Sequence, residues 1–133
     1  MAASLLPMSI LSAGCASDIP QARLRPDPRL TAEVIRQVSV QVRRCYRAPK
    51  VASVARQIST RLAVRYAADG SIVEIPVVLG QTGVTPANAS YAGKMAEAAT
   101  AAVIRCAPVN LPTNLYEQVW KELELTFSPA RMV

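Results

Sequence analysis

The placement of three cysteines constrains this chain more than any other feature of its sequence. Cys45 ends one stretch with helical periodicity, Cys106 ends another, and an arginine precedes each of them. Both fall on the apolar side of their helices, so a disulfide would join the ends of two helices that pack together. Two buried free thiols are the alternative, because unpaired cysteine is common in protein cores. Export from the cytosol would favour the disulfide.

The 133 residues include no histidine, which removes the commonest general base and the commonest metal ligand. The serines therefore have no imidazole to activate them. Glu122 and Glu124 share one face of a strand, but nothing apolar surrounds them that would suit acid–base chemistry. The stretch GQTG at residues 80–83 lacks the lysine of a phosphate-binding loop. Two cysteines without histidine do not complete a zinc site. We therefore expect a protein without enzymatic activity, metal or cofactor.

The composition predicts one domain with an aliphatic, alanine-rich core, because hydrophobic residues make up 51% of the chain and aromatic residues only 5%. The net charge of +6 favours acidic partners, anionic lipid surfaces or nucleic acid. A solvated helix face is the simpler explanation of the arginines. We expect no nucleic-acid partner, since interleaved aromatic residues and a recognisable reading module are missing. Most of the positive charge in the first half comes from Arg36, Arg43, Arg44, Arg47, Arg56, Arg61 and Arg65.

Residues 1–16 are expected to form a signal-like segment. The apolar stretch MAASLLPMSILSAG leads directly into Cys15, which resembles a bacterial lipoprotein signal, although no Lys or Arg precedes it. In such a signal the cysteine is lipidated and anchors the protein to a membrane. An ordinary cleavable signal ending near Ala16, or a disordered tail, is the alternative. Residues 17–29 contain three prolines and several charges and predict a linker, so the folded domain is expected over residues 30–133.

The folded part begins with a helix and a β-hairpin. Thr31 can cap the helix, whose positions 34, 38, 42 and 45 share one apolar face until Pro49 stops it. Residues 58–66 alternate between apolar and polar, Asp69-Gly70 predicts a hairpin turn, and residues 73–79 alternate again. Pro76 lies inside this second strand, which predicts a sheet edge or a bulge.

A second helix over residues 87–105 and a third strand over residues 121–127 complete the pattern. The order α-β-β-α-β predicts an α+β fold, in which a three-stranded antiparallel-type sheet carries two helices on one face. The second and third strands would form its edges. Ion pairs across the strands, of little energetic weight if exposed, are expected on the other face among Arg61, Arg65, Glu74, Glu122 and Glu124.

Four stretches, taken in order, carry a family resemblance. They are RRCYRAP at residues 43–49, RLAVRYAADGSIVEIP at 61–76, IRCAPVNLP at 104–112 and YEQVWKELELTFSPARM at 116–132. Together they resemble the C-terminal periplasmic domain of TolA proteins, most nearly the alphaproteobacterial form. The paired cysteines match that domain's pattern as well. A more distant likeness is to the TonB C-terminal domain, which has a similar order of elements.

The TolA resemblance implies a non-enzymatic, periplasmic binding domain of the Tol-Pal cell-envelope system. Its implied partners are envelope proteins such as TolB or Pal, and colicin or filamentous phage proteins use such a domain as a receptor. Two alternatives remain open. One is a TonB-like transducer fragment that recognises a receptor peptide, and the other is a basic structural lipoprotein of the envelope.

Binding is expected at a sheet edge, where an extended peptide adds a strand through backbone hydrogen bonds. Since Pro76 interrupts the second strand, the third strand is the better candidate. The alternative is that both edges are merely protected from aggregation, a role for which proline is a common device. The expected binding residues on the two edges are Leu123, Leu125, Phe127, Val73, Ile75 and Val77.

Overall fold

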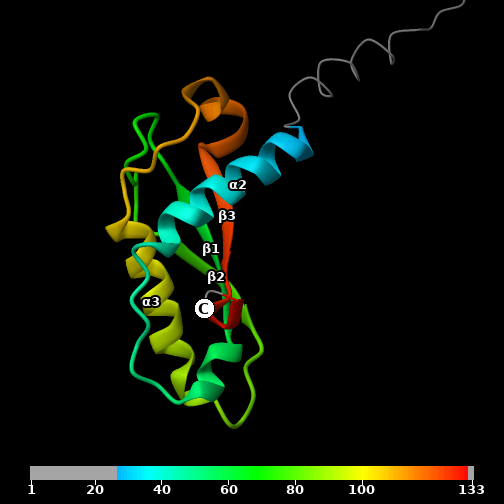
Figure 1. Cartoon of the computed structure of the whole chain (residues 1–133), viewed down its shortest axis with the longest axis vertical. Coiled ribbons are helices and arrows are strands. Elements are labelled where there is room, and N and C mark those ends of the chain that lie inside the picture. The colour runs from blue at the N-terminus through cyan, green and yellow to red at the C-terminus, as the bar shows by residue number, and fades with distance from the viewer. Residues whose placement is uncertain (1–26, 132–133) are drawn as a thin grey trace, which may run out of the picture.

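Residues 27–131 are described by a computed structural model, in which two helices lie on one face of a small sheet (Figure 1). The predicted signal-like segment, Cys15 and most of the predicted linker lie outside these residues. The order α-β-β-α-β is confirmed, and so is the α+β class. The main elements are α2 (Pro28–Arg43), β1 (Ser59–Arg65), β2 (Val77–Thr82), α3 (Ala92–Arg105) and β3 (Glu122–Phe127).

The sheet has the strand order β2-β1-β3, and β1 runs antiparallel to both neighbours. Leu62 in β1 lies opposite Leu125 of β3 and Val78 of β2. The second and third strands are therefore the two edges, as the sequence predicts. A register shift beside Leu62 places a bulge in the β1–β2 pairing, whereas the β1–β3 pairing is regular over six residues of each strand.

Helix α2 begins earlier than the sequence suggests. Its N-cap is Asp27 instead of Thr31, and the Asp27 carboxylate accepts a hydrogen bond of 2.8 Å from the backbone N–H of Arg29. Pro28 occupies the first turn, where its missing N–H costs nothing and its fixed φ suits the helix. The helix then ends at Arg43, well before Pro49. The last residues of the predicted linker thus belong to the folded domain.

Strand β2 differs most from its prediction over residues 73–79. Ile72 forms only an isolated bridge with Tyr66, and the chain leaves the sheet until Val77. Pro76 is buried in this excursion, and it has no N–H to donate to a ladder. The strand instead continues through Gly80, Gln81 and Thr82, beyond its predicted end at residue 79.

The connection from α3 to β3 contains two helical turns. A 3₁₀ turn (Thr113–Leu115) is followed by a π-helical turn (Tyr116–Trp120). Within it the indole N–H of Trp120 donates to the Pro112 carbonyl at 2.6 Å, and the Tyr116 hydroxyl donates to the Tyr66 carbonyl at 2.7 Å. These two bonds connect the turn to the core and to the end of β1.

The main core lies between the two helices and one face of the sheet. It combines aliphatic residues with three buried aromatic side chains, and it follows the predicted stripes of both helices. A smaller cluster of Ala55, Ile58 and Met95 lies at the N-terminal end of α3. The main cluster contains Val34, Val38, Val42, Leu62, Val64, Tyr66, Ala99, Ala102, Val103, Val109, Leu111, Val119, Trp120, Leu123, Leu125 and Phe127.

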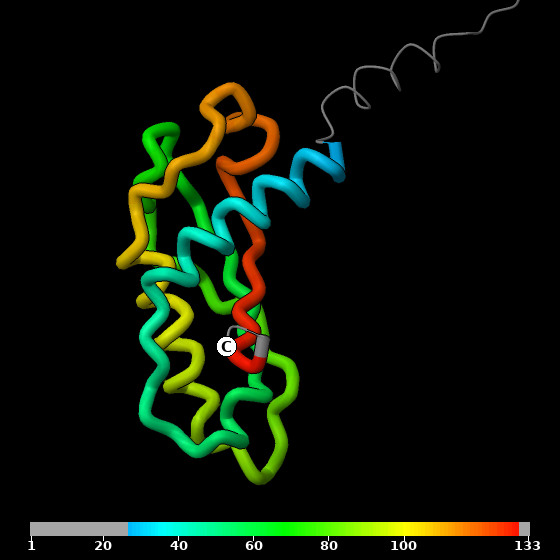
Figure 2. Tube along the Cα trace, in the orientation of Figure 1, coloured from blue at the N-terminus to red at the C-terminus, as the bar shows by residue number. Residues whose placement is uncertain are grey.

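The hairpin turn after β1 packs against the link that follows α3, as Figure 2 shows for these distant parts of the chain. Gly70 has a φ of 88° and its carbonyl accepts a hydrogen bond of 2.9 Å from the backbone N–H of Val109. A Cβ at this position would overlap the backbone oxygen of Val109. Only glycine meets both conditions, because a side chain here is strained by the dihedral angle and by the contact.

We expect the substitution Gly70→Ala to lower the free energy of unfolding by at least about 2 kcal/mol, from backbone strain and the clash with Val109. Urea titration of the purified chain measures the loss. Gly93→Ala is the matched control, because no heavy atom lies within 4 Å of a Cβ built in that helix. This control should be neutral or slightly stabilising. Equal stabilities of the two variants would contradict the packing of the turn.

Candidate protein-binding edge

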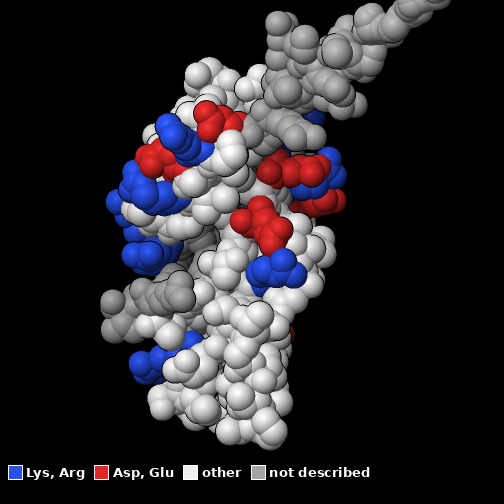
Figure 3. All heavy atoms as spheres, turned by 90° about the vertical axis from the view of Figure 1, so that its right-hand side faces the viewer, with Lys and Arg blue, Asp and Glu red and all other residues white. Residues whose placement is uncertain are grey.

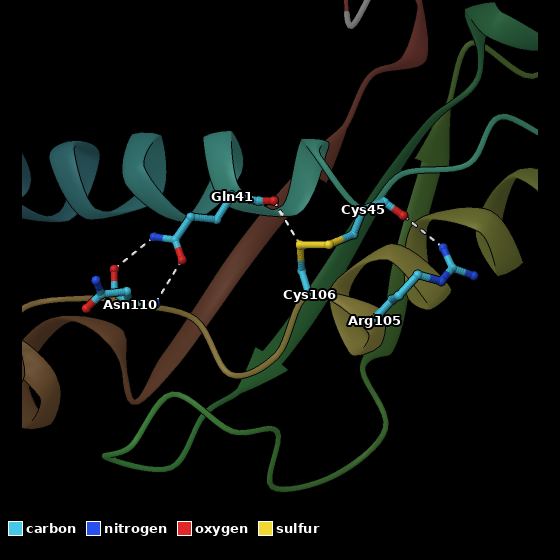
Figure 4. Close-up of a disulfide and its surroundings, with 5 residues drawn as sticks. All are labelled: Gln41, Cys45, Arg105, Cys106 and Asn110. Atoms are coloured by element: carbon cyan, nitrogen blue, oxygen red, sulfur yellow. Dashed lines mark hydrogen bonds between the residues drawn. A yellow bond between two sulfur atoms is a disulfide. The ribbon is translucent and has the colours of Figure 1, made fainter.

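A disulfide between Cys45 and Cys106 joins the ends of α2 and α3 (Figure 4). Their Cα atoms are 5.5 Å apart, which confirms the predicted pairing over the free-thiol alternative. The Arg105 guanidinium donates to the Cys45 carbonyl at 2.8 Å. The Cys106 sulfur lies 2.9 Å from the Gln41 carbonyl oxygen, a contact without a hydrogen because the sulfur is oxidised.

A pair of hydrogen bonds, here called the clamp, joins α2 to the link after α3, one turn before the disulfide. The Gln41 side-chain amide donates to the Asn110 carbonyl at 2.8 Å, and its oxygen accepts from the Asn110 backbone N–H at 2.8 Å. The disulfide and this two-point contact hold the C-terminal end of α2 against α3 and the following link. They thereby fix the angle at which α2 crosses β3. Figure 1 shows α2 passing over that strand and extending beyond it.

The outer edge of β3 carries unpaired backbone groups in a regular pattern. The backbone N–H of Tyr66 donates to the Lys121 carbonyl at 3.0 Å, so these two residues form a hydrogen-bonded pair. Hydrogen-bonded pairs alternate along an antiparallel ladder. Leu123, Leu125 and Phe127 therefore direct their backbone N–H and C=O groups toward β1. The N–H and C=O groups that point away from the sheet belong to Glu122, Glu124 and Thr126.

The side chains of β3 alternate in the same way. Leu123, Leu125 and Phe127 are buried in the core, so three of the predicted binding residues contribute a strand and not an exposed contact surface. Glu122, Glu124 and Thr126 are exposed. A peptide at this edge would therefore meet backbone groups first.

A groove of about 250 Å³ runs between α2 and the C-terminal half of β3. The side chains of Leu125 and Phe127 contribute its apolar floor, and Arg43 is an exposed cation on its helical side. No pattern in the sequence indicates the helical side of this groove, because the crossing of α2 over β3 determines which residues flank the strand. The groove is lined by Ser39, Val42, Arg43, Leu125, Thr126, Phe127 and Ser128.

The other predicted edge has exposed apolar side chains on an irregular backbone. Val73 and Ile75 are 56% and 73% exposed, but both lie in the excursion before β2. Val77 is the first residue of the strand and is 55% exposed. The bulge beside Leu62 then interrupts the ladder within the strand. The two groups of predicted residues thus lie on opposite edges and do not form one site.

The face of the sheet away from the helices carries the predicted ion pairs. Arg61 contacts Glu124 at 2.8 Å, and Arg65 contacts both Glu74 and Glu122 at 3.3 Å. All these side chains are about half exposed, so the pairs are screened by solvent and contribute little to stability. Their main effect is to keep the face beside the β3 edge polar and balanced in charge.

Burial raises the pKa of Tyr46, whose ring centroid lies 5.7 Å from that of Phe127 in the groove lining, and the other groups with shifted pKa values within residues 27–131 do not line the groove. Hydrogen bonds from Arg36 and Gln37 lower the pKa of Glu33 to about 2, and hydrogen bonds from Ser71 lower the pKa of Asp69. Burial raises the pKa of Tyr66 to about 12. No group of three Asp, Glu or Cys side chains in this part of the chain is arranged to hold a metal ion. The groove therefore offers backbone hydrogen bonds and an apolar recess for binding.

Tyr66 gives a pH-dependent prediction, because its buried hydroxyl has no hydrogen-bond partner within residues 27–131. We expect Tyr66→Phe to raise the free energy of unfolding by about 1 kcal/mol at neutral pH, by removing an unsatisfied polar group. Since the folded-state pKa is raised, the unfolded chain ionises first, and wild-type stability falls as the pH rises from about 10 to about 12. Urea titrations at increasing pH should show the advantage of the variant growing over this range. A constant difference would contradict the buried hydroxyl.

Comparison of the chain with protein-family models, curated proteins and solved structures found no match. In residues 27–131, none of the helices combines the length and the apolarity that crossing a bilayer requires.

Proposed function

We propose that this protein is an envelope protein-binding domain of the TolA C-terminal type, which binds an extended peptide segment of its partner by strand addition to β3. The α-β-β-α-β order, the three-stranded sheet and the disulfide between the helix ends support this proposal, together with the four sequence motifs. The observation that carries it is the open edge of β3, where Glu122, Glu124 and Thr126 direct backbone groups outward beside the groove.

The geometry favours β3 over β2 for pairing with a peptide. Strand addition needs donors and acceptors at a regular spacing, and it gains specificity from pockets for alternate side chains. The β3 edge has both features, since its ladder is regular and the groove lies along it. A strand added there would direct every second side chain toward the groove, whose lining includes the largely buried Val42 and Phe127.

The proposed location is the periplasm, because disulfides persist in oxidising compartments. The proposed partners are TolB, Pal or a similar envelope protein, and a colicin or phage protein would use the same edge. Lipidation at Cys15 stays a prediction, since that residue lies outside the described part of the chain. A pull-down from envelope extract identifies the partner, and recovery of a transporter segment would favour the TonB-like alternative.

The substitution Thr126→Pro tests the binding mode. Proline removes the outward N–H and adds bulk at the free edge, but it takes no donor from the β1–β3 ladder. We expect the variant to remain folded and to lose the envelope partner in the pull-down, whereas Thr126→Ala should retain it. Far-ultraviolet circular dichroism and thermal unfolding check the fold of both variants. Undiminished recovery of the partner by folded Thr126→Pro would exclude strand addition at β3.

A further inference from the structure

A group of exposed cations without carboxylate partners within residues 27–131 lies at the end of α2, in the connector that follows it and at the end of α3. Arg44, Arg47, Lys50 and Arg105, here called the basic ridge, are all exposed. None of them forms a salt bridge within residues 27–131, unlike Arg36, Arg61, Arg65 and Lys121. The hydrogen bond from Arg105 to the Cys45 carbonyl connects the two parts of the ridge.

The salt bridges of the domain are unevenly distributed between its two faces. On the sheet face, Arg61 and Arg65 are neutralised by three glutamates. On the helices within residues 27–131, the salt bridge between Glu33 and Arg36 lies about two turns before the end of α2, and the exposed Glu97 of α3 forms no salt bridge with the ridge. Figure 3 shows mostly basic side chains along its left margin, which is the side of the helices, with acidic ones among the uppermost of them, and acidic side chains mixed with basic ones nearer the centre.

Exposed apolar side chains accompany the basic ridge. Val40 lies one turn before Arg44 on the outer face of α2 and is 39% exposed, and Ile104 lies beside Arg105 and is 45% exposed. Cations with apolar residues among them suit the boundary between lipid headgroups and acyl chains. Single-stranded nucleic acid is bound through exposed aromatic rings, whereas every aromatic residue within 27–131 is buried or only partly exposed. The surface therefore favours a membrane over nucleic acid.

We propose that the basic ridge binds the surface of a membrane that contains anionic phospholipids. In that orientation the helices face the headgroups and the polar face of the sheet is turned toward solvent. The β3 edge lies at the side of the domain and stays accessible to a peptide. This inference does not depend on strand addition, since none of the ridge residues lines the groove.

Vesicle cosedimentation tests the inference with the full chain, purified without acylation, and its disulfide intact. The probes are vesicles of mixed phosphatidylglycerol and phosphatidylcholine, and vesicles of phosphatidylcholine alone. We expect binding to the anionic vesicles that weakens as salt is added. Because each basic residue near the surface contributes roughly fivefold, Arg44→Gln/Arg47→Gln/Lys50→Gln should weaken binding by on the order of 100-fold.

The matched control is Arg61→Gln/Arg65→Gln/Lys121→Gln, which removes the same charge from elsewhere on the domain and should bind nearly as the wild type does. The N-terminal residues are identical in all these proteins and cannot cause a difference between them. An equal loss in both triple variants would show an effect of net charge alone and overturn the proposal. Absence of binding to the anionic vesicles would also overturn it, as would a ridge-dependent preference for duplex DNA over vesicles.

Discussion

Replacing both Cys45 and Cys106 by alanine should lower the free energy of unfolding by about 4 kcal/mol. The disulfide spans a sequence separation of 61, and removing a closure of this length restores a large conformational entropy to the unfolded chain. This loss is a substantial part of the roughly 5–15 kcal/mol that a domain commonly has. Guanidinium titrations of the oxidised wild type and the double variant measure the difference.

The single cysteine variants test whether the bridge itself accounts for the loss of stability. Each single variant, Cys45→Ala or Cys106→Ala, should lose nearly as much stability as the double variant, because either one opens the loop. The clamp between Gln41 and Asn110 remains in all three variants, so α2 should stay docked when they are folded. A double variant within about 1 kcal/mol of the wild type would contradict this account of the bridge.

Trp120→Ala should lower the free energy of unfolding by about 4 kcal/mol, because it leaves a large cavity in the core. The indole is 1% exposed, and its ring centroid lies 4.7 Å from that of Tyr116 and 6.4 Å from that of Tyr66. The substitution also leaves the Pro112 carbonyl without its donor. Urea titration followed by far-ultraviolet circular dichroism measures the loss, since the chain's only tryptophan is removed.

Two further variants separate the contributions of Trp120. Trp120→Phe keeps much of the packing and removes the N–H, so it should lose less than half as much stability as the alanine variant. Tyr116→Phe removes only the hydrogen bond to the Tyr66 carbonyl and should cost about 1 kcal/mol. If Trp120→Ala cost no more than Tyr116→Phe, the π-helical turn would not be part of the core.

The elements that could be predicted are those whose burial follows a simple period. Val34, Val38 and Val42 mark the inner face of α2, and the alternation along β1 and β3 marks which residues enter the core. Strand order also follows from the sequence, because a hairpin and a helical crossover leave few arrangements for three strands. Burial of one side of a helix or strand produces a periodic pattern of apolar residues. This pattern can be recognised in the sequence without knowledge of the tertiary structure.

The features that could not be predicted depend on contacts between residues that are distant in the sequence, which a local sequence pattern does not indicate. The excursion at Val73–Pro76 and the π-helical turn are determined by what they pack against, as is the buried Asn88. The Asn88 side chain accepts from the Thr85 N–H and donates to the Val54 and Gly83 carbonyls. The groove was missed for the same reason, since the crossing angle of α2 brings Ser39 and Arg43 beside β3.

Amide hydrogen exchange, with and without the partner recovered from envelope extract, tests the central claim most directly. In the free protein the N–H groups of Glu122, Glu124 and Thr126 should exchange quickly, while those of Leu123 and Leu125 are protected by β1. Binding should slow exchange at the three outward amides of β3. Protection that appears only along β2, or nowhere in the sheet, would contradict strand addition at this edge.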